Sequence, residues 1–194
     1  MRIKKEIPII LCLFVVTTFI LVRGRIFTSS EARVCVDPTE KTVYPYDTFT
    51  INVNVTSVSA IEAYSFIIYY HTIPVDGVSV ELPPGHFFEP SKHEELLITD
   101  MEIDDNYNAT HGRVSVTVRL FSNARRPAPT CKLRNIRQVE LESWRAGSGI
   151  LFTITFNCTG SGTSVLDLHK VILFPHEGAS TSHSRIHGLI NAHS

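Results

Sequence analysis

Residues 49–56 have the sequence Phe-Thr-Ile-Asn-Val-Asn-Val-Thr, in which every odd-numbered position is apolar and every even-numbered position is polar. A period of two places all the apolar side chains on one face of an extended strand. The alternation resumes at residues 149–158, and in the most hydrophobic segment, residues 61–70, the positions Tyr64, Phe66, Ile68 and Tyr70 share one face. A chain built from such segments buries its core between two sheets, so we predict an all-β sandwich.

Turn residues separate the alternating segments, and they define about nine strands. We predict strands, in chain order, at residues 34–36, 48–58, 61–70, 78–82, 96–103, 112–121, 149–158, 165–174 and 188–191. Residues 122–149 break the pattern and predict a long excursion, with a short strand or helix around residues 139–144. No segment after residue 33 has the periodicity of an amphipathic helix.

The N-terminus has the composition of a secretory signal. Arg2, Lys4 and Lys5 precede an apolar stretch at residues 7–22, which predicts one N-terminal hydrophobic helix. Sixteen helical residues span about 24 Å, which is less than the roughly 30 Å of a membrane's hydrocarbon core. We therefore expect this segment to insert in the membrane at least transiently.

Two outcomes are open for this segment. Ser30-Glu31-Ala32 offers a site for cleavage, whereas Arg23 and Arg25 follow the apolar stretch and favour an uncleaved signal-anchor. In both cases residues 1–32 form a signal peptide or signal-anchor, and residues 33–194 form one domain outside the cytoplasm. The expected location is secreted or cell-surface, with residues 7–22 as the anchor if cleavage does not occur.

Charge and cysteine content limit the partners and the covalent framework. The 162 residues of the predicted domain carry 13 basic and 17 acidic side chains, a formal charge of −4. This balance gives no electrostatic basis for binding nucleic acid or an anionic membrane.

The domain has three cysteines. The strand pattern places the side chain of Cys35 outward and that of Cys158 inward, so we do not expect those two to form a disulfide. A Cys131–Cys158 pair stays open.

Three Asn-x-Thr tripeptides fit an exported domain. The glycosylation candidates are Asn54, Asn108 and Asn157. Asn54 lies on the polar face of its predicted strand, where a glycan can be tolerated.

The order of the segments resembles that of a known family, the cohesin domains. The resemblance rests on Val34–Pro38, Asp47–Val55, Ala63–Tyr70, Asn108–Val114, Gly147–Phe156, Ser164–Leu168 and Gly188–Ile190. It spans roughly residues 33–192 and depends on ordered strands, not on a catalytic signature. In this resemblance, Gly147–Phe156 corresponds to the family's eighth strand.

The resemblance implies a nine-stranded jelly-roll β-sandwich, related to carbohydrate-binding modules, that binds calcium-loaded dockerin modules. It therefore implies a role in protein–protein assembly linked to polysaccharide degradation or to the cell surface. The family's partner surface lies on strands three, five, six and eight. Carried over to this chain, the partner face comprises Ser65, Ile67, Tyr69, Ser115, Thr117, Arg119, Leu151, Thr153 and Thr155. Ile67 and Tyr69 are large apolar residues on a solvent-facing side, which fits either an interface or an edge covered by the long excursion at residues 122–149.

Catalytic and metal-binding motifs are missing from the sequence. His93 and His176 each precede glutamate, but neither has a second histidine four positions on, as a zinc-protease helix requires. His183, His187 and His193 allow a metal site, but solvated loop histidines explain them more simply. We predict no catalytic residues, no cofactor and no metal, and therefore not an enzyme.

Two charged segments can be interpreted either as binding sites or as ordinary solvent-exposed residues. Asp100, Glu102 and Asp104 alternate with apolar residues, so an outward strand face explains them better than a calcium loop does. The basic residues of the excursion could bind an acidic partner or could simply be exposed to solvent in a loop. These residues are Arg125, Arg126, Lys132, Arg134 and Arg137.

Two other functions compete with the cohesin-like module. A carbohydrate-binding module on the same fold would bind polysaccharide by stacking sugar rings on Tyr44, Tyr46, Tyr69 or Trp144. A structural cell-surface domain would pack only against its neighbours.

Overall fold

A computed structural model describes residues 31–122, 141–176 and 182–194, which form eleven strands and no helix. The strands are β1 (Ala32–Asp37), β2 (Glu40–Val43), β3 (Thr48–His71), β4 (Val75–Glu81), β5 (Glu94–Asp104), β6 (His111–Ser122), β7 (Leu141–Glu142), β8 (Arg145–Cys158), β9 (Gly162–Pro175), β10 (His183–Ile186) and β11 (Gly188–Ala192). The all-β prediction is confirmed for these residues. The predicted N-terminal helix lies outside them, as do the five basic residues of the excursion.

The 24-residue strand β3 joins the two layers of the sandwich. It combines the strands predicted at residues 48–58 and 61–70. The alternation is interrupted between them at Ser57, which has a positive φ of 55°, and the pairing of β3 with β8 shifts register between Val55 and Ile61. Such irregularities bend a strand and increase its twist, so the first half of β3 lies in one layer and the second half in the other.

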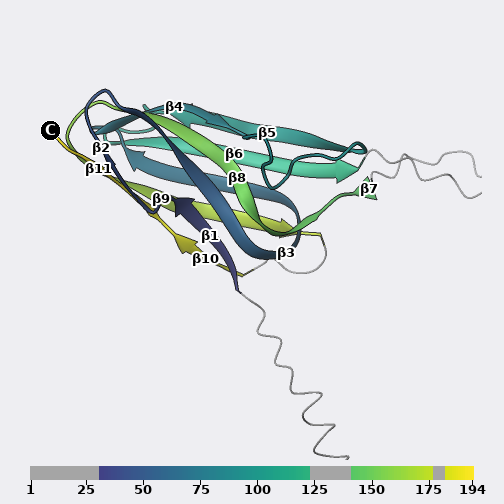
Figure 1. The fold of residues 1–194 in the computed structure, drawn as a ribbon. Coiled ribbons are helices and arrows are strands. Elements are labelled where there is room, and N and C mark those ends of the chain that lie inside the picture. Colours follow the sequence, from purple (N-terminus) through teal and green to yellow (C-terminus); the bar gives the residue numbers. More distant parts are fainter. Residues whose placement is uncertain (1–30, 123–140, 177–181) are drawn as a thin grey trace, which may run out of the picture. The chain divides into compact units, whose positions relative to one another are not determined.

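Each half of β3 has its own neighbours. The first half pairs with β1 and β8, and the strand order of that layer is β10-β1-β3-β8-β4. The second half pairs with β6 and β9, and the order is β5-β6-β3-β9. The layer continues from β9 to β11 and β2, which lie together at the end of the molecule where Figure 1 marks the C-terminus.

The core between the layers is rich in aromatic rings. Tyr64 and Phe66 from the second half of β3 pack on Phe152 of β8, and Phe88 from the connection before β5 lies 5.1 Å from Tyr64, between ring centroids. The hydroxyl of Tyr64 donates a hydrogen bond of 3.1 Å to the carbonyl of Leu151, which satisfies the one polar group of this cluster. Burial raises the pKa of Tyr64 above its ordinary value.

An ion pair holds the connection before β5 against β8. The guanidinium of Arg145 donates to both carboxylate oxygens of Glu94, at 2.9 and 2.6 Å, and also to the carbonyl of Glu89 at 2.9 Å. Both side chains are largely buried. The arrangement is a bidentate, charge-assisted contact, and it holds the pKa of Glu94 well below its usual range.

Besides the merged strand β3 and the earlier starts of β4 and β9, the structure differs from the predicted strands as follows. Strands β2 and β10 were not predicted, and β8 begins at Arg145, four residues before the predicted start. β2 and β10 are four-residue strands that each pair in parallel with one neighbour, β11 or β1, and neither alternates clearly in burial. The first residues of β8 pair with the irregular part of β3, so they also lack alternation.

The cysteine prediction agrees with the structure. Cys35 is partly exposed on β1 and Cys158 is buried at the end of β8, and both are free thiols. Burial is the largest cause of the raised pKa of Cys35. Cys131 lies outside the described residues. Within those residues no helix is long and apolar enough to cross a membrane.

Candidate partner-binding face

The second half of β3 presents one side to the core and the other to solvent. Tyr64, Phe66, Ile68 and Tyr70 are buried, whereas the alternate residues Ser65, Ile67 and Tyr69 are partly exposed. This is the alternation that the sequence predicts. The solvent-facing side of β3 is the centre of a broad sheet surface, which we call the candidate face.

Strand β6 extends the candidate face on one side of β3, as predicted. Ser65 lies opposite Thr117 and Ile67 opposite Ser115. The hydroxyls of Ser65 and Thr117 share a hydrogen bond of 3.0 Å. Arg119 is also on this face, and its guanidinium forms an ion pair of 3.2 Å with Glu62. The structure therefore brings together on this side six of the nine residues predicted for the partner face, of which Ser115 is buried.

The other three predicted residues lie in the opposite layer. Leu151, Thr153 and Thr155 belong to β8, which pairs with the first half of β3 and with β4. Leu151 is fully buried, and the hydroxyl of Thr153 donates a 2.8 Å hydrogen bond to Asn52. Their predicted place on the partner face is therefore wrong. The alternation of residues 149–158 shows that they form a strand, but it does not show in which layer that strand pairs.

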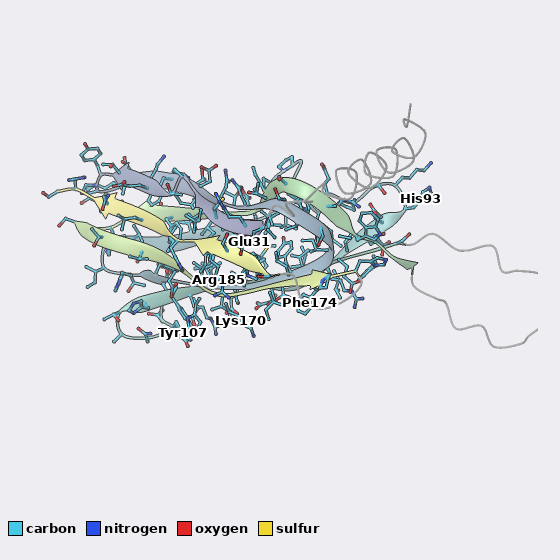
Figure 2. All side chains as sticks on the ribbon, turned by 90° about the horizontal axis from the view of Figure 1, so that it is seen from below. Glu31, His93, Tyr107, Lys170, Phe174 and Arg185 are labelled. Atoms are coloured by element: carbon cyan, nitrogen blue, oxygen red, sulfur yellow. The ribbon has the colours of Figure 1, made fainter. Side chains whose placement is uncertain are left out.

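Strand β9 takes the place that the prediction gave to β8. Ser65 lies opposite Ile172, Ile67 opposite Lys170, and Tyr69 opposite Asp167. Phe174, 41% exposed, continues this row of outward side chains along β9. Figure 2 shows Lys170 and Phe174 along one side of the sandwich, with Tyr107 further along the same side.

Strand β5 forms the other border of the candidate face and makes it acidic. Leu97 pairs with Arg119, Asp100 with Thr117, and Glu102 with Ser115, so their side chains face outward as the alternation of the acidic run predicts. Within the part of the chain that the structure describes, Asp100 and Glu102 form no ion pair, whereas Asp104 lies 3.9 Å from Arg113. No group of three or more metal-ligating side chains occurs among the described residues.

A groove of about 370 Å³ lies at one end of the candidate face. We call it the end groove, and its lining residues are Tyr69, His71, Tyr107, Asn108, His111, Val165, Asp167 and His169. Tyr69 stacks on Tyr107 with ring centroids 5.1 Å apart and contacts the ring of His169 at 4.9 Å. Its hydroxyl donates to that of Tyr107 at 3.3 Å, and this hydrogen bond is the largest cause of the raised pKa of Tyr69.

Three further polar residues line the end groove, and one of them, Asp167, contacts His187, which is outside the lining. His71 of β3 and His111 of β6 are cross-strand partners with ring centroids 4.2 Å apart. Asp167 lies 3.0 Å from the Nδ1 atom of His187. Sequence analysis missed His71, His111 and Asp167, because they meet only through the pairing of β3 with β6 and β9, which the sequence does not show.

The aromatic residues considered for sugar binding do not form one platform. Tyr46 is 94% exposed in the turn before β3, and Tyr44 contacts His193 near the C-terminus. Trp144 lies between β7 and β8 and contacts His176. β7 lies at the end of the molecule opposite to the C-terminus in Figure 1. Tyr69 lies in the end groove, where its ring contacts the rings of Tyr107 and His169.

Three comparisons with known proteins bear on the fold. No family model matches the chain, and no curated protein matches it either. Among solved structures, the non-cellulosomal cohesin from Archaeoglobus fulgidus is similar, with 11% identity and a TM-score of 0.53 over 85% of this chain and 93% of that one.

Two cohesins solved with dockerins are similar as well. The sixth cohesin of scaffoldin B from Acetivibrio cellulolyticus, in complex with the Cel5 dockerin, has 10% identity and a TM-score of 0.56 over 84% of this chain and 100% of that one. The Coh-OlpA–Doc918 complex from Clostridium thermocellum matches with 12% identity and a TM-score of 0.55 over 84% and 100% of the two chains. The described domain therefore has the fold of the cohesin domains.

Proposed function

We propose that the domain is a non-catalytic, cohesin-like binding module that docks a dockerin-type protein through the candidate face. The observation that carries this proposal is the composition of the face. At its centre Ile67 of β3 and Ile172 of β9 are diagonal apolar neighbours, with Lys170 opposite Ile67. Its border strand β5, separated from β3 by β6, carries the carboxylates of Asp100 and Glu102, which form no ion pair among the described residues. A flat surface with an apolar centre and a polar rim is typical of a protein interface.

The solved neighbours support the same kind of partner. Several of these cohesins were solved in complex with dockerins.

The acidic border of the face favours a partner that carries positive charge. Asp100 and Glu102 are unpaired among the described residues, so a partner with lysine or arginine opposite β5 would be favoured.

The proposal places the domain outside the cytoplasm, secreted or held at the cell surface, in an assembly linked to polysaccharide degradation. The basic and apolar N-terminal segment supports export. Direct polysaccharide binding has less support, because Trp144 lies at the end of the molecule opposite to Tyr44, which contacts His193 near the C-terminus.

The experiment compares two substitutions on the same strand. Ile67→Asp changes the candidate face, and Thr50→Asp changes an exposed position of β3 in the opposite layer. The full chain is immobilised, extracellular proteins of the source organism are passed over it, and any captured dockerin-type protein is purified for affinity measurement. We expect Ile67→Asp to weaken binding by about tenfold or more, because a buried unpaired charge costs at least about 1.4 kcal/mol.

The matched variant decides the interpretation. Thr50→Asp is expected to keep the affinity of the unchanged chain. Equal affinities for all three proteins would show that the candidate face is not the docking surface. Capture of polysaccharide in place of protein would favour the carbohydrate-binding alternative.

A further inference from the structure

The three Asn-x-Thr tripeptides differ in how much of each is exposed. Asn108, Ala109 and Thr110 are all exposed in the connection between β5 and β6. In the other two tripeptides the middle residue, Val55 or Cys158, is buried in the core. A transferase must bind the whole tripeptide to modify its asparagine, so the folded domain offers it only residues 108–110.

The other two asparagines are also fixed by their neighbours. Asn54 pairs with strands on both sides, and its amide donates a 3.2 Å hydrogen bond to Asp37. Asn157 pairs with β3 and β4, and its carbonyl oxygen accepts a 2.7 Å hydrogen bond from Thr48. Neither backbone can leave its sheet without breaking ladder hydrogen bonds.

The side chain of Asn108 is oriented with its amide nitrogen free. Its Oδ1 atom accepts hydrogen bonds from the backbone N–H groups of Thr110, at 2.9 Å, and His111, at 2.8 Å. These contacts hold the carbonyl side of the amide toward the backbone. Within the described residues the Nδ2 atom of Asn108 makes no hydrogen bond.

We propose that Asn108 is the N-glycosylation site of the folded domain. The reaction joins Nδ2 of Asn108 to the anomeric carbon of a sugar carried on a lipid-linked phosphate. The bond between that carbon and the phosphate oxygen breaks, the lipid phosphate leaves with the electron pair, and the amide gives up one proton to a base. No oxidant or reductant is required.

A glycan at this position begins in the end groove. Asn108 lines the groove together with Tyr69, Tyr107 and His169. The first sugar therefore lies against the rings of this end of the candidate face and leaves Ile172 at the centre and Leu97 at the other end open. If the proposed function holds, the modification restricts docking to the part of the face away from the groove.

The site is tested on the folded full chain in detergent. It is incubated with a single-subunit oligosaccharyltransferase that accepts Asn-x-Ser/Thr and with its lipid-linked donor, and the modified asparagine is located by peptide mass. We expect modification of Asn108 to exceed that of Asn54 and Asn157 by at least about tenfold, a difference of about 1.4 kcal/mol in activation free energy. The variant Thr110→Ala should lose the modification and Thr110→Ser should keep it.

Synthetic peptides that span each tripeptide provide the control for intrinsic reactivity. All three peptides are expected to be modified, so the selectivity of the folded chain must come from its structure. Modification of the folded chain at Asn54 or Asn157 to the same extent as at Asn108 would overturn the proposal. So would an unmodified Asn108 in a folded chain whose peptide reacts.

The position of the glycan has its own readout. Hydroxyl-radical footprinting compares the modified and unmodified chains at Tyr69, Tyr107 and His169, with the exposed Tyr46 as the reference residue. We expect oxidation at the groove residues to fall at least about twofold and oxidation of Tyr46 to stay the same. Unchanged groove oxidation would overturn the placement of the glycan. Neither measurement uses a partner, so failure here is distinct from failure of the proposed function.

Discussion

Tyr69 of β3 and Asp167 of β9 are cross-strand partners on the solvent-facing side of one sheet. This pairing shows that β9, and not β8, borders the second half of β3. The candidate face therefore has an aromatic and acidic end at Tyr69 and Asp167, an apolar centre at Ile67 and Ile172, and an acidic border on β5.

The first prediction distinguishes the two strands. Ile172→Asp on β9 should weaken binding of the partner by about tenfold or more, because the charge would be buried without a partner at the centre of the interface. Thr155→Asp on β8 should leave the affinity unchanged, since that residue lies in the opposite layer. Surface plasmon resonance with the purified partner measures both. Weaker binding only in Thr155→Asp would restore the assignment made from sequence.

The second prediction concerns the acidic border. Glu102→Lys should slow association with the partner and reduce the dependence of the association rate on salt, because exposed interfacial charges act mainly through electrostatic steering. Glu81→Lys is the matched change on an exposed position of β4. Stopped-flow association rates at low and high salt test the prediction. The same loss of rate in both variants would indicate a general charge effect and not a role of β5.

The third prediction concerns the ion pair between Arg145 and Glu94. Arg145→Met leaves the largely buried carboxylate of Glu94 without its partner, so we expect the free energy of unfolding to fall by about 3 kcal/mol. Urea denaturation at neutral pH measures the change. A loss no larger than that of an exposed ion pair, below about 1 kcal/mol, would show that water replaces the guanidinium.

The fourth prediction gives the pH dependence of the same pair. Arg145 is the largest cause of the lowered pKa of Glu94. A carboxyl with a lowered folded-state pKa stabilises the protein above its unfolded pKa of about 4.3, and that contribution is lost as the pH falls further. The stability difference between the unchanged chain and Glu94→Gln should therefore shrink below about pH 4. A difference in the free energy of unfolding that stays constant from pH 7 to pH 3 would contradict this prediction.

The fifth prediction compares two phenylalanines. Phe152 is fully buried between the layers and Phe174 is exposed on β9. Phe152→Ala should lower the free energy of unfolding by about 3–5 kcal/mol, because it removes buried apolar surface and leaves a cavity. Phe174→Ala should change the stability by less than about 1 kcal/mol. Thermal and urea unfolding measure both, and equal losses would contradict the described core.

The sequence predicted the fold class because alternation is a local property. Phe49 to Val55 and Tyr64 to Tyr70 show their buried sides in the sequence alone, and the structure confirms both. Pairing between distant strands is not local. The sequence therefore placed Ser65 and Thr117 correctly on one face but could not show that Thr155 belongs to the opposite layer.

There is also a physical reason why some elements could not be predicted from the sequence. β2 has one buried residue, Val43, and β10 has none, so neither carries an alternating signal. The end groove was missed because His71, His111 and Asp167 meet only through the pairing of β3 with β6 and β9. The N-terminal segment and the basic residues at 125–137 lie outside the described residues, so the predictions made for them stay predictions.

The central claim is that the solvent-facing side of β5, β6, β3 and β9 docks a protein. Hydrogen–deuterium exchange of the full chain, with and without the purified partner, tests it most directly. We predict slower exchange at residues 63–71, 113–121 and 167–174 when the partner is bound. Slower exchange confined to residues 48–58 and 150–158 of the opposite layer would contradict the claim.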